Sequence, residues 1–219
     1  MSHPLAILVV ATMGGTLVTG ISAAQKLATE INIAAMEPGV VPPGFTFWRT
    51  GNGAAAEWQV VADASAAGQK AIAQTSKDTT DYRFPLAVYQ PVSAKDVDVV
   101  VRFKPVGGTV DQAGGIAVRL TTPDDYYVVR ANALEDNVNF YRVVKGRRSQ
   151  IKDFDTKVAT GQWHTLGLRT EGERFTVTFD GRKLFTVEDK TFADAGKVAL
   201  WTKADSVTHF DAISITPLD

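Results

Sequence analysis

Hydrophobic and polar residues alternate along most of this chain, and a period of two is the pattern of a half-buried β-strand. The clearest run covers residues 96–106, where apolar residues occupy every second position from Val97 to Phe103. Similar runs predict strands at residues 45–48, 57–63, 70–76, 84–90, 115–121, 126–134, 137–145, 163–170, 174–180, 183–187, 197–203 and 207–216. Because polar turns separate these short runs, the pattern predicts an all-β fold, an antiparallel β-sandwich or jelly roll.

Three of these runs, between residues 113 and 148, carry polar and aromatic side chains in matching phase. The apolar positions are even-numbered in residues 115–121 and 137–145 and odd-numbered in residues 126–134, so the intervening residues face outward. In residues 197–203, Trp201 and Lys203 share the phase opposite Val198 and Leu200, and they join the same surface if that strand borders the central three. The predicted ligand-binding residues are Arg119, Arg130, Asn132, Asn139, Tyr141, Trp201 and Lys203.

These residues also have a structural interpretation. Charged side chains such as Arg119 and Arg130 are typical of the solvated side of any antiparallel sheet. Asn132 and Asn139 are common residue types at strand ends and turns. Both interpretations remain open for this set at the level of sequence.

Composition narrows the range of partners. The 219 residues are enough for one substantial core, and 23 Lys and Arg residues nearly balance 24 Asp and Glu residues. A basic field that would attract nucleic acid is therefore not expected. The sequence contains no cysteine, which excludes disulfides, thiol catalysis and Cys-ligated zinc. Nothing in the pattern defines an oligomeric state.

The first residues have the character of an export signal. Residues 5–21 are uncharged and largely apolar, and Ser22 to Ala24 form a small-x-small cleavage site, so residues 1–24 are predicted to be a signal peptide. An uncleaved membrane anchor is the alternative, although the run is short and glycine-containing for a span. We therefore expect an exported protein, periplasmic or extracellular and without a stable membrane span after cleavage. Its predicted parts are a lead-in segment, residues 25–44, and one jelly-roll domain, residues 45–219.

Several motifs together resemble a known family. They are Pro-x-Gly-Phe at residues 42–45, Trp-Gln-Val at 58–60, Asp-Val-x-Val-Arg-Phe-Lys at 98–104, Asp-Tyr-Tyr-Val-Val-Arg-Ala-Asn at 125–132, Phe-Asp-Gly at 179–181 and Gly-Lys-Val-Ala-Leu-Trp at 196–201. Their order is similar to that of the concanavalin A-like lectin/glucanase jelly rolls, and within them to the exported bacterial 3-keto-disaccharide hydrolase domains. The resemblance implies two curved sheets, a ligand on the concave face and carbohydrate as the partner. The side chains suit that ligand, because arginine and asparagine can form paired hydrogen bonds with sugar hydroxyl groups and the rings of Tyr141 and Trp201 can pack on sugar rings.

Carboxylates decide whether an enzyme is expected. Glycoside hydrolysis needs two carboxyl groups about 5–10 Å apart. The Glu-x-Asp-x-x-Glu motif of jelly-roll glucanases, which supplies them, is absent from this sequence. A 3-keto sugar needs only one base and one cation, because its ketone acidifies the neighbouring C2 proton. Arg130 or Lys203 would supply the cation, and Asp125, Glu135 or His209 the base.

The sequence specifies no cofactor or metal. His164 and His209 are the histidines beyond the signal region, and they have no metal-binding spacing. Oxygen-rich loops at Asp124, Asp125, Glu135 and Asp136 are compatible with Ca²⁺, but their spacing defines no site. The sequence therefore predicts an exported carbohydrate-binding jelly roll, with hydrolase or lyase activity on 3-keto-glycosides left open. A non-catalytic protein-interaction or structural domain of the cell surface or periplasm is the alternative.

Overall fold

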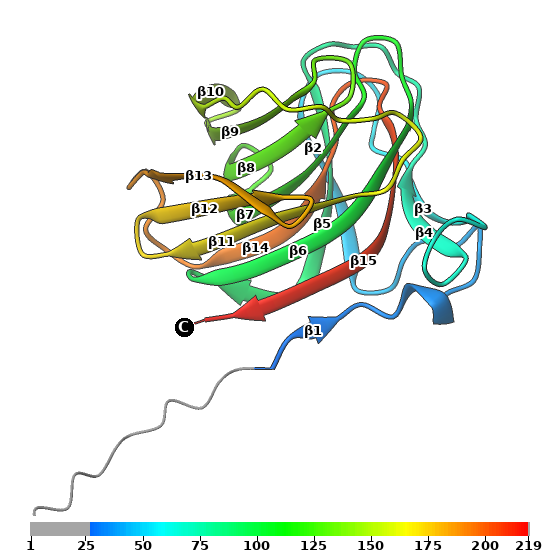
Figure 1. Ribbon diagram of the computed structural model, residues 1–219, viewed down its shortest axis with the longest axis horizontal. Coiled ribbons are helices and arrows are strands. Elements are labelled where there is room, and N and C mark those ends of the chain that lie inside the picture. Colours follow the sequence, from blue (N-terminus) through cyan, green and yellow to red (C-terminus); the bar gives the residue numbers. More distant parts are fainter. Residues whose placement is uncertain (1–26, 219) are drawn as a thin grey trace, which may run out of the picture.

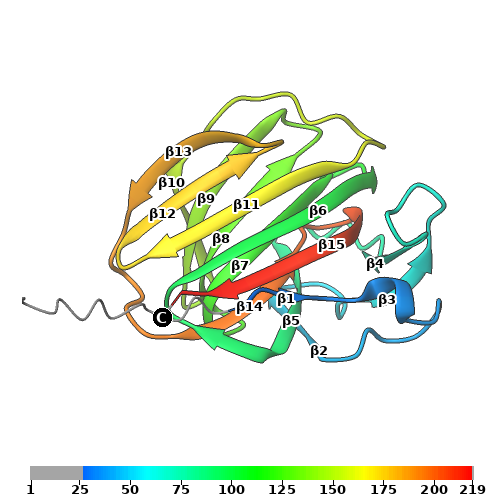
Figure 2. The same ribbon diagram turned by 60° about the horizontal axis from the view of Figure 1, so that its bottom comes forward.

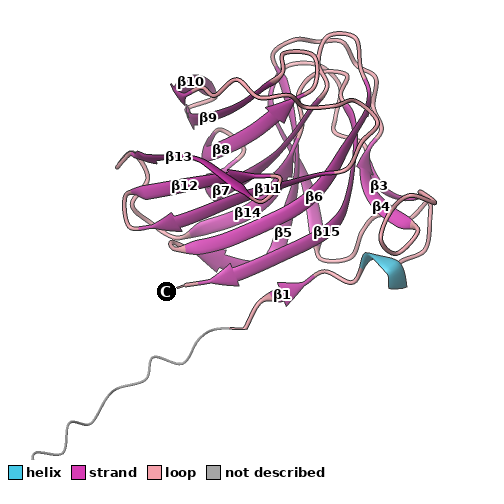
Figure 3. Cartoon of the chain, viewed as in Figure 1, coloured by secondary structure: helices cyan, strands magenta, loops and turns pink. Residues whose placement is uncertain are grey.

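The computed structural model describes residues 27–218. The predicted signal peptide therefore lies outside the described residues, as do the first two residues of the predicted lead-in segment. Strands dominate the described chain, which has a single short 3-10 helix, η1 (Ile33–Ala35), before the sandwich (Figure 3). No helix in residues 27–218 is long and apolar enough to cross a membrane.

Two antiparallel sheets face each other, as predicted (Figures 1 and 2). Sheet A has the order β13 (Arg182–Glu188), β12 (Arg174–Phe179), β11 (His164–Glu171), β6 (Val97–Gly107), β15 (Val207–Pro217), β4 (Lys70–Gln74), β3 (Trp58–Ala62), with β1 (Thr29–Glu30) beside β15. Sheet B has the order β10 (Arg147–Lys152), β9 (Asn137–Val144), β8 (Asp125–Asn132), β7 (Ala113–Thr122), β14 (Gly196–Trp201), β5 (Arg83–Ala94), β2 (Phe45–Gly51). Strands far apart in sequence thus become neighbours, as in a jelly roll.

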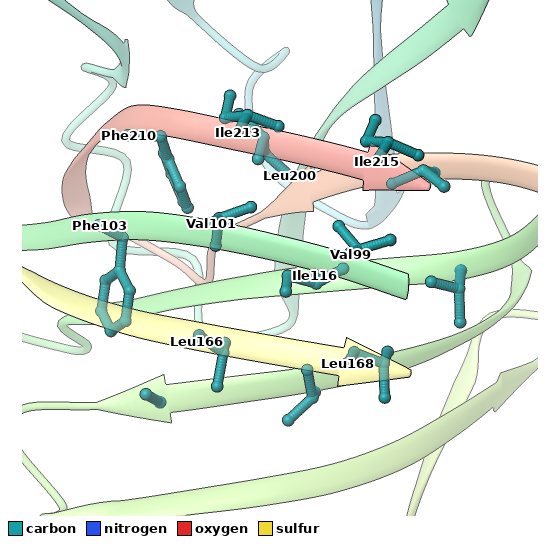
Figure 4. Close-up of a cluster of buried hydrophobic side chains, with 14 of the residues drawn as sticks. Val99, Val101, Phe103, Ile116, Leu166, Leu168, Leu200, Phe210, Ile213 and Ile215 are labelled. Carbon is teal, nitrogen blue, oxygen red and sulfur yellow. The ribbon is translucent and has the colours of Figure 1, made fainter. Parts of the chain in front are cut away.

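The main core lies between the sheets. Alternate residues of β6, β11 and β15 point inward and meet Ile116 of β7 and Leu200 of β14 (Figure 4). Val99, Val101 and Phe103 on β6 are buried, as the alternation in residues 96–106 predicts. The lead-in segment contributes to this core, because Ile33 is buried in it and β1 pairs with the end of β15.

Sheet B carries a second apolar cluster on its other face. This cluster includes Phe84, Leu86, Val88, Ala117, Leu120, Tyr126, Val128, Tyr141, Val143, Ala199 and Trp201. Thr50 Oγ1 on edge strand β2 lies 2.8 Å from the Tyr126 hydroxyl on β8, although three strands separate β2 from β8 in the sheet. Sheet B therefore curls toward this face, which is its concave face. A residue of these strands that points away from the inter-sheet core is consequently not always exposed to water.

Three local expectations were wrong. Strand β10 was not predicted, because residues 147–152 are mostly polar on both faces and have no alternation. The usual position of proline, at a sheet edge or a strand start, does not hold at Pro85, because Pro85 is the third residue of β5 and β5 lies inside sheet B, between β14 and β2. Leu120 belongs to the concave cluster and not to the inter-sheet core. The phase changes at Arg119, which has a φ of 50° and interrupts the regular pairing of β7 with both neighbours.

Candidate functional site

A row of paired residues crosses the concave face of sheet B. Trp201 on β14 pairs with Gly115 on β7, Gly115 with Arg130 on β8, and Arg130 with Asn139 on β9. Strand β14 therefore borders the central three strands, which is the adjacency on which the predicted surface depended. A Cβ atom at Gly115 would lie 2.6 Å from the Val129 carbonyl oxygen, so this position excludes a side chain. The row thus has a gap between the indole and the guanidinium.

Arg130 is the centre of the polar end of this face. It is 3% exposed, and its guanidinium donates hydrogen bonds to Asn137 Oδ1 at 2.6 Å, Glu135 Oε2 at 2.6 Å and the Tyr141 hydroxyl at 3.0 Å. Asn139 Nδ2 donates to the same hydroxyl at 3.1 Å. Arg130 Nε is buried without a hydrogen-bond partner among the described residues. Most donors of this group are therefore already oriented by protein contacts.

A second chain of ionic and amide contacts runs from Asn132 through Asp111 and Lys203 to Asp81. Asn132 Nδ2 donates to Asp111 Oδ1 at 2.6 Å, and Lys203 Nζ lies 2.8 Å from Asp111 Oδ2 and 2.6 Å from Asp81 Oδ1. Asp111 is buried, whereas Asp81 is exposed. We call the whole set the polar cluster: Asp81, Asp111, Arg130, Asn132, Glu135, Asn137, Asn139, Tyr141 and Lys203.

The charges of the polar cluster influence one another. Burial disfavours the ionised Glu135, but Arg130, Asn137 and Lys203 outweigh it and lower the Glu135 pKa. Burial also opposes the charge of Lys203, yet the hydrogen bonds that its ammonium donates to Asp111 and Asp81 raise the Lys203 pKa. For Asp111 burial dominates, and its pKa is raised. Glu135 thus stays ionised and Lys203 stays protonated at neutral pH.

Trp201 has no exposed surface, so it supports the site from below and does not offer a face to a ligand. Its ring stacks on Phe84 at 5.3 Å, and its Nε1 donates to the Tyr126 hydroxyl at 3.3 Å. Arg148 from β10 covers this aromatic group, with its guanidinium carbon 5.8 Å from the Trp201 ring and 4.6 Å from the Tyr141 ring. The predicted stacking role of Trp201 is therefore not available in this structure.

Arg119 does not belong to the polar cluster. The irregularity in β7 turns its side chain toward the end of the sandwich, where it is 1% exposed. There the guanidinium donates to the carbonyl oxygens of Lys95 at 3.0 Å, Phe192 at 2.7 Å and Gly172. It also lies 5.1 Å above the Phe175 ring. The expectation that Arg119 binds ligand is corrected to a structural role in joining three loops.

Of the three candidate bases, only Glu135 lies in the polar cluster. Asp125 accepts hydrogen bonds from Thr122 Oγ1 and the Lys145 amide, which fixes it in a turn. His209 is on β15 of sheet A and contacts Asp63 at 2.7 Å. Within residues 27–218 no group of three or more His, Asp or Glu side chains is arranged to hold a metal ion.

Two residues of the exposed rim of the cluster, Asp81 and Tyr82, were not predicted from the sequence. Tyr82 is 39% exposed, and its hydroxyl joins two segments by donating to Gly146 O at 2.9 Å and accepting from Arg148 N at 2.8 Å. Next to it, Asp81 carries the ion pair with Lys203. Both residues lie in the loop after strand β4, where polar and apolar positions do not alternate. The sequence offers only one indication of them, an aromatic residue next to an acidic one. Asp111 likewise lies in a loop.

This architecture defines a lectin-type jelly roll. The carbohydrate-binding module CBM66 from Bacillus subtilis superposes with a TM-score of 0.60 at 22% identity, over 79% of this chain and 95% of that one. Lectin II from Ulex europaeus gives 0.61 at 10% identity, over 88% and 99%. The Bacillus licheniformis β-glucanase gives 0.56 at 13% identity, over 89% and 99%. At these identities the likeness establishes the fold.

The family follows from the sequence match. Residues 76–218 match the galactocerebrosidase C-terminal lectin domain, and the chain belongs to this family. No curated protein matches the chain. The matched region starts just before β5 and contains every strand of the polar cluster. The match supports a lectin-like domain, but it does not single out the 3-keto-disaccharide hydrolase domains that the motifs resemble.

Proposed function

We propose that this protein is an exported, non-catalytic lectin domain that binds carbohydrate at the rim of the polar cluster. The observation that carries the proposal is the combination of an exposed aromatic ring, Tyr82, with Asp81, Lys203 and Glu135 held in place by buried partners. Fixed carboxylate, ammonium and amide groups bind sugar hydroxyls, and a neighbouring ring packs on the apolar face of a pyranose. The lectin family and the carbohydrate-binding module of similar fold support this ligand class.

The buried layer makes the rim rigid. Asp111 and Asn132 hold Lys203, and Arg130 holds Glu135 at 2.6 Å, so little side-chain entropy remains to be lost when a ligand binds. Glu135 is the accessible member of its pair, with a side chain 46% exposed against 4% for Arg130. A ligand therefore meets carboxylates and the Lys203 ammonium first, while Arg130 acts through Glu135.

Titration calorimetry against a panel of neutral mono- and disaccharides tests this function. Replacing Tyr82 by Ala should weaken binding about tenfold, because ring packing contributes about 0.5–1.5 kcal/mol beyond buried area. Tyr82→Phe keeps the ring and should retain most of the affinity. Lys157→Met removes a cation of an exposed ion pair outside the cluster and serves as a control. Equal binding by wild type and Tyr82→Ala would contradict the proposal.

A 3-keto-glycoside hydrolase or lyase activity is the second candidate. It is supported by the contact between Glu135 and Arg130, a carboxylate base beside a cation that would stabilise an enolate. The lowered pKa of Glu135 makes it a weak base, which is why binding is proposed first. Release of free sugar from a 3-keto-disaccharide by wild type and not by Arg130→Ala would favour catalysis. Unchanged turnover in that variant would exclude it.

Export is part of the same proposal. Cleavage after Ala24 would leave a mature chain of residues 25–219, with the lead-in segment and the jelly roll intact. Intact-mass measurement of protein recovered outside the cytoplasm tests the cleavage site. A mass that includes residues 1–24 would favour the membrane-anchor alternative.

A further inference from the structure

A second concave feature lies on the other side of the β9–β10 hairpin. It is a pocket of about 760 Å³ lined by Arg142, Val144, Lys145, Arg147, Ser149 and Thr191. In the register of this hairpin Val144 pairs with Arg147 and Arg142 with Ser149, so these four side chains share one face. Arg142 and Val144 have the phase of Val138 and Phe140, which face the inter-sheet core. The pocket is therefore on the opposite face of sheet B from the polar cluster.

The pocket lies at the β10 edge of sheet B. Strand β10 is an edge strand, and the chain after β13 supplies the opposite wall through Thr191. Figure 1 shows the β9–β10 hairpin and β13 at the same end of the molecule. On this face of β9 and β10, the positions in phase with the apolar core carry mostly charged and hydroxyl-bearing side chains. This composition indicates a surface built for a polar ligand.

The lining is positively charged. It contains three basic residues and no carboxylate. The adjacent Asp189 is already engaged, because it accepts hydrogen bonds from the Tyr127 hydroxyl at 2.6 Å, Arg142 Nη1 at 2.8 Å and Thr191 N at 2.8 Å. Lys145 and Arg147 are exposed and form no ion pair with any residue in 27–218. Two cations are thus available to an incoming anion.

We infer that this pocket binds the sulfate or carboxylate substituent of an anionic glycan. A guanidinium and an ammonium are complementary to an oxyanion, the Ser149 and Thr191 hydroxyls can donate to it or to neighbouring sugar hydroxyls, and Val144 offers a small apolar floor. The volume accommodates one or two sugar units. The site is separate from the polar cluster and does not depend on the function proposed for it.

The charge pattern favours a glycan over a membrane or nucleic acid. Anionic lipid surfaces attract clusters of about four to eight basic residues, whereas three line this pocket. Nucleic acid requires a basic field over a wide face, but the chain has a net charge of −1. A concave site with few cations and two hydroxyl groups suits a discrete substituent.

Binding to dextran sulfate, with unsulfated dextran as the neutral probe, tests the inference in the full mature chain at 50 and 300 mM NaCl. We expect dextran sulfate to bind and dextran not to bind through this pocket. The double variant Lys145→Gln/Arg147→Gln should bind dextran sulfate about tenfold more weakly, because two charged hydrogen-bond donors are lost. The control Lys77→Gln/Lys183→Gln removes the same charge from exposed positions outside the pocket and should change affinity less than twofold.

Three further measurements distinguish this pocket from general electrostatic binding, from the polar cluster and from a membrane surface. Ser149→Ala should weaken dextran sulfate binding about threefold with an unchanged salt dependence, because a neutral donor is lost. Tyr82→Ala should leave it unchanged, which separates this pocket from the polar cluster. An equal loss in the control pair would overturn the inference in favour of general electrostatics. Binding to phosphatidylserine vesicles without binding to dextran sulfate would overturn it in favour of a membrane surface.

Discussion

Replacing Arg119 and Arg130 by methionine in turn distinguishes a structural arginine from a ligand-positioning one. Arg119 donates to three backbone carbonyl oxygens and lies over Phe175, and it is almost completely buried. Leaving buried acceptors unpaired costs about 1–3 kcal/mol each, with partial relief from water at the loop ends. Arg119→Met should therefore lower the free energy of unfolding by about 3–5 kcal/mol. That is a large part of the about 5–15 kcal/mol typical of a folded domain.

Arg130→Met should cost less, because its partner Glu135 is half exposed and Asn137 is partly exposed, so both can rehydrate. We expect about 1–2 kcal/mol for this variant, together with weaker binding of neutral sugars. Urea unfolding followed by tryptophan fluorescence gives both free energies, and calorimetry at a temperature where both variants are folded gives the affinities. A loss below about 1 kcal/mol for Arg119→Met would refute the reasoning. So would loss of sugar binding in a folded Arg119→Met protein.

Three more predictions concern the loops and strands around the site. Asp205 accepts hydrogen bonds from three consecutive backbone amides, and these outweigh burial and lower the Asp205 pKa below 3.8. The contribution of Asp205 to stability should therefore be present at neutral pH and lost as the pH falls below about 4, which acid unfolding measures. Asp205→Ala should flatten that acid dependence. A Cβ at Gly196 would lie 2.4 Å from the Arg119 carbonyl carbon, so Gly196→Ala should lower the thermal midpoint by several degrees in calorimetry. Glu135→Gln removes the charge that Arg130 holds, and it should weaken sugar binding severalfold while leaving urea stability within about 1 kcal/mol; an unchanged affinity would contradict a role for Glu135.

The fold could be predicted from sequence because its signal is local. Side chains on a strand alternate between two faces, so Val97, Val99 and Val101 indicate both a strand and its buried side without knowledge of the neighbours. The same logic correctly grouped Arg130, Asn132, Asn139 and Tyr141 on one face of β8 and β9. It failed at Arg119, where one residue of positive φ shifts the phase, and at β10, which has no alternation.

The remainder of the site depends on contacts between distant segments. Lys203 meets Asp111 and Asp81, which lie 92 and 122 positions earlier, and no local pattern encodes such a meeting. Exposure also depends on the tertiary structure. Trp201 has an outward phase, yet the curl of sheet B and the Arg148 side chain remove it from water.

The sequence alone therefore determined most of the strands, the sandwich class and the residue types that are proposed to bind sugars, because a period of two is a property of the backbone itself. Only the tertiary structure decided which of these residues are accessible to a ligand and which are buried and hold the accessible ones in place. Sheet curvature, strand order and loop packing bring Tyr82, Asp81 and Glu135 to the rim and place Trp201 beneath it. These features arise from contacts between segments far apart in the chain, and alternation along a single strand carries no information about them.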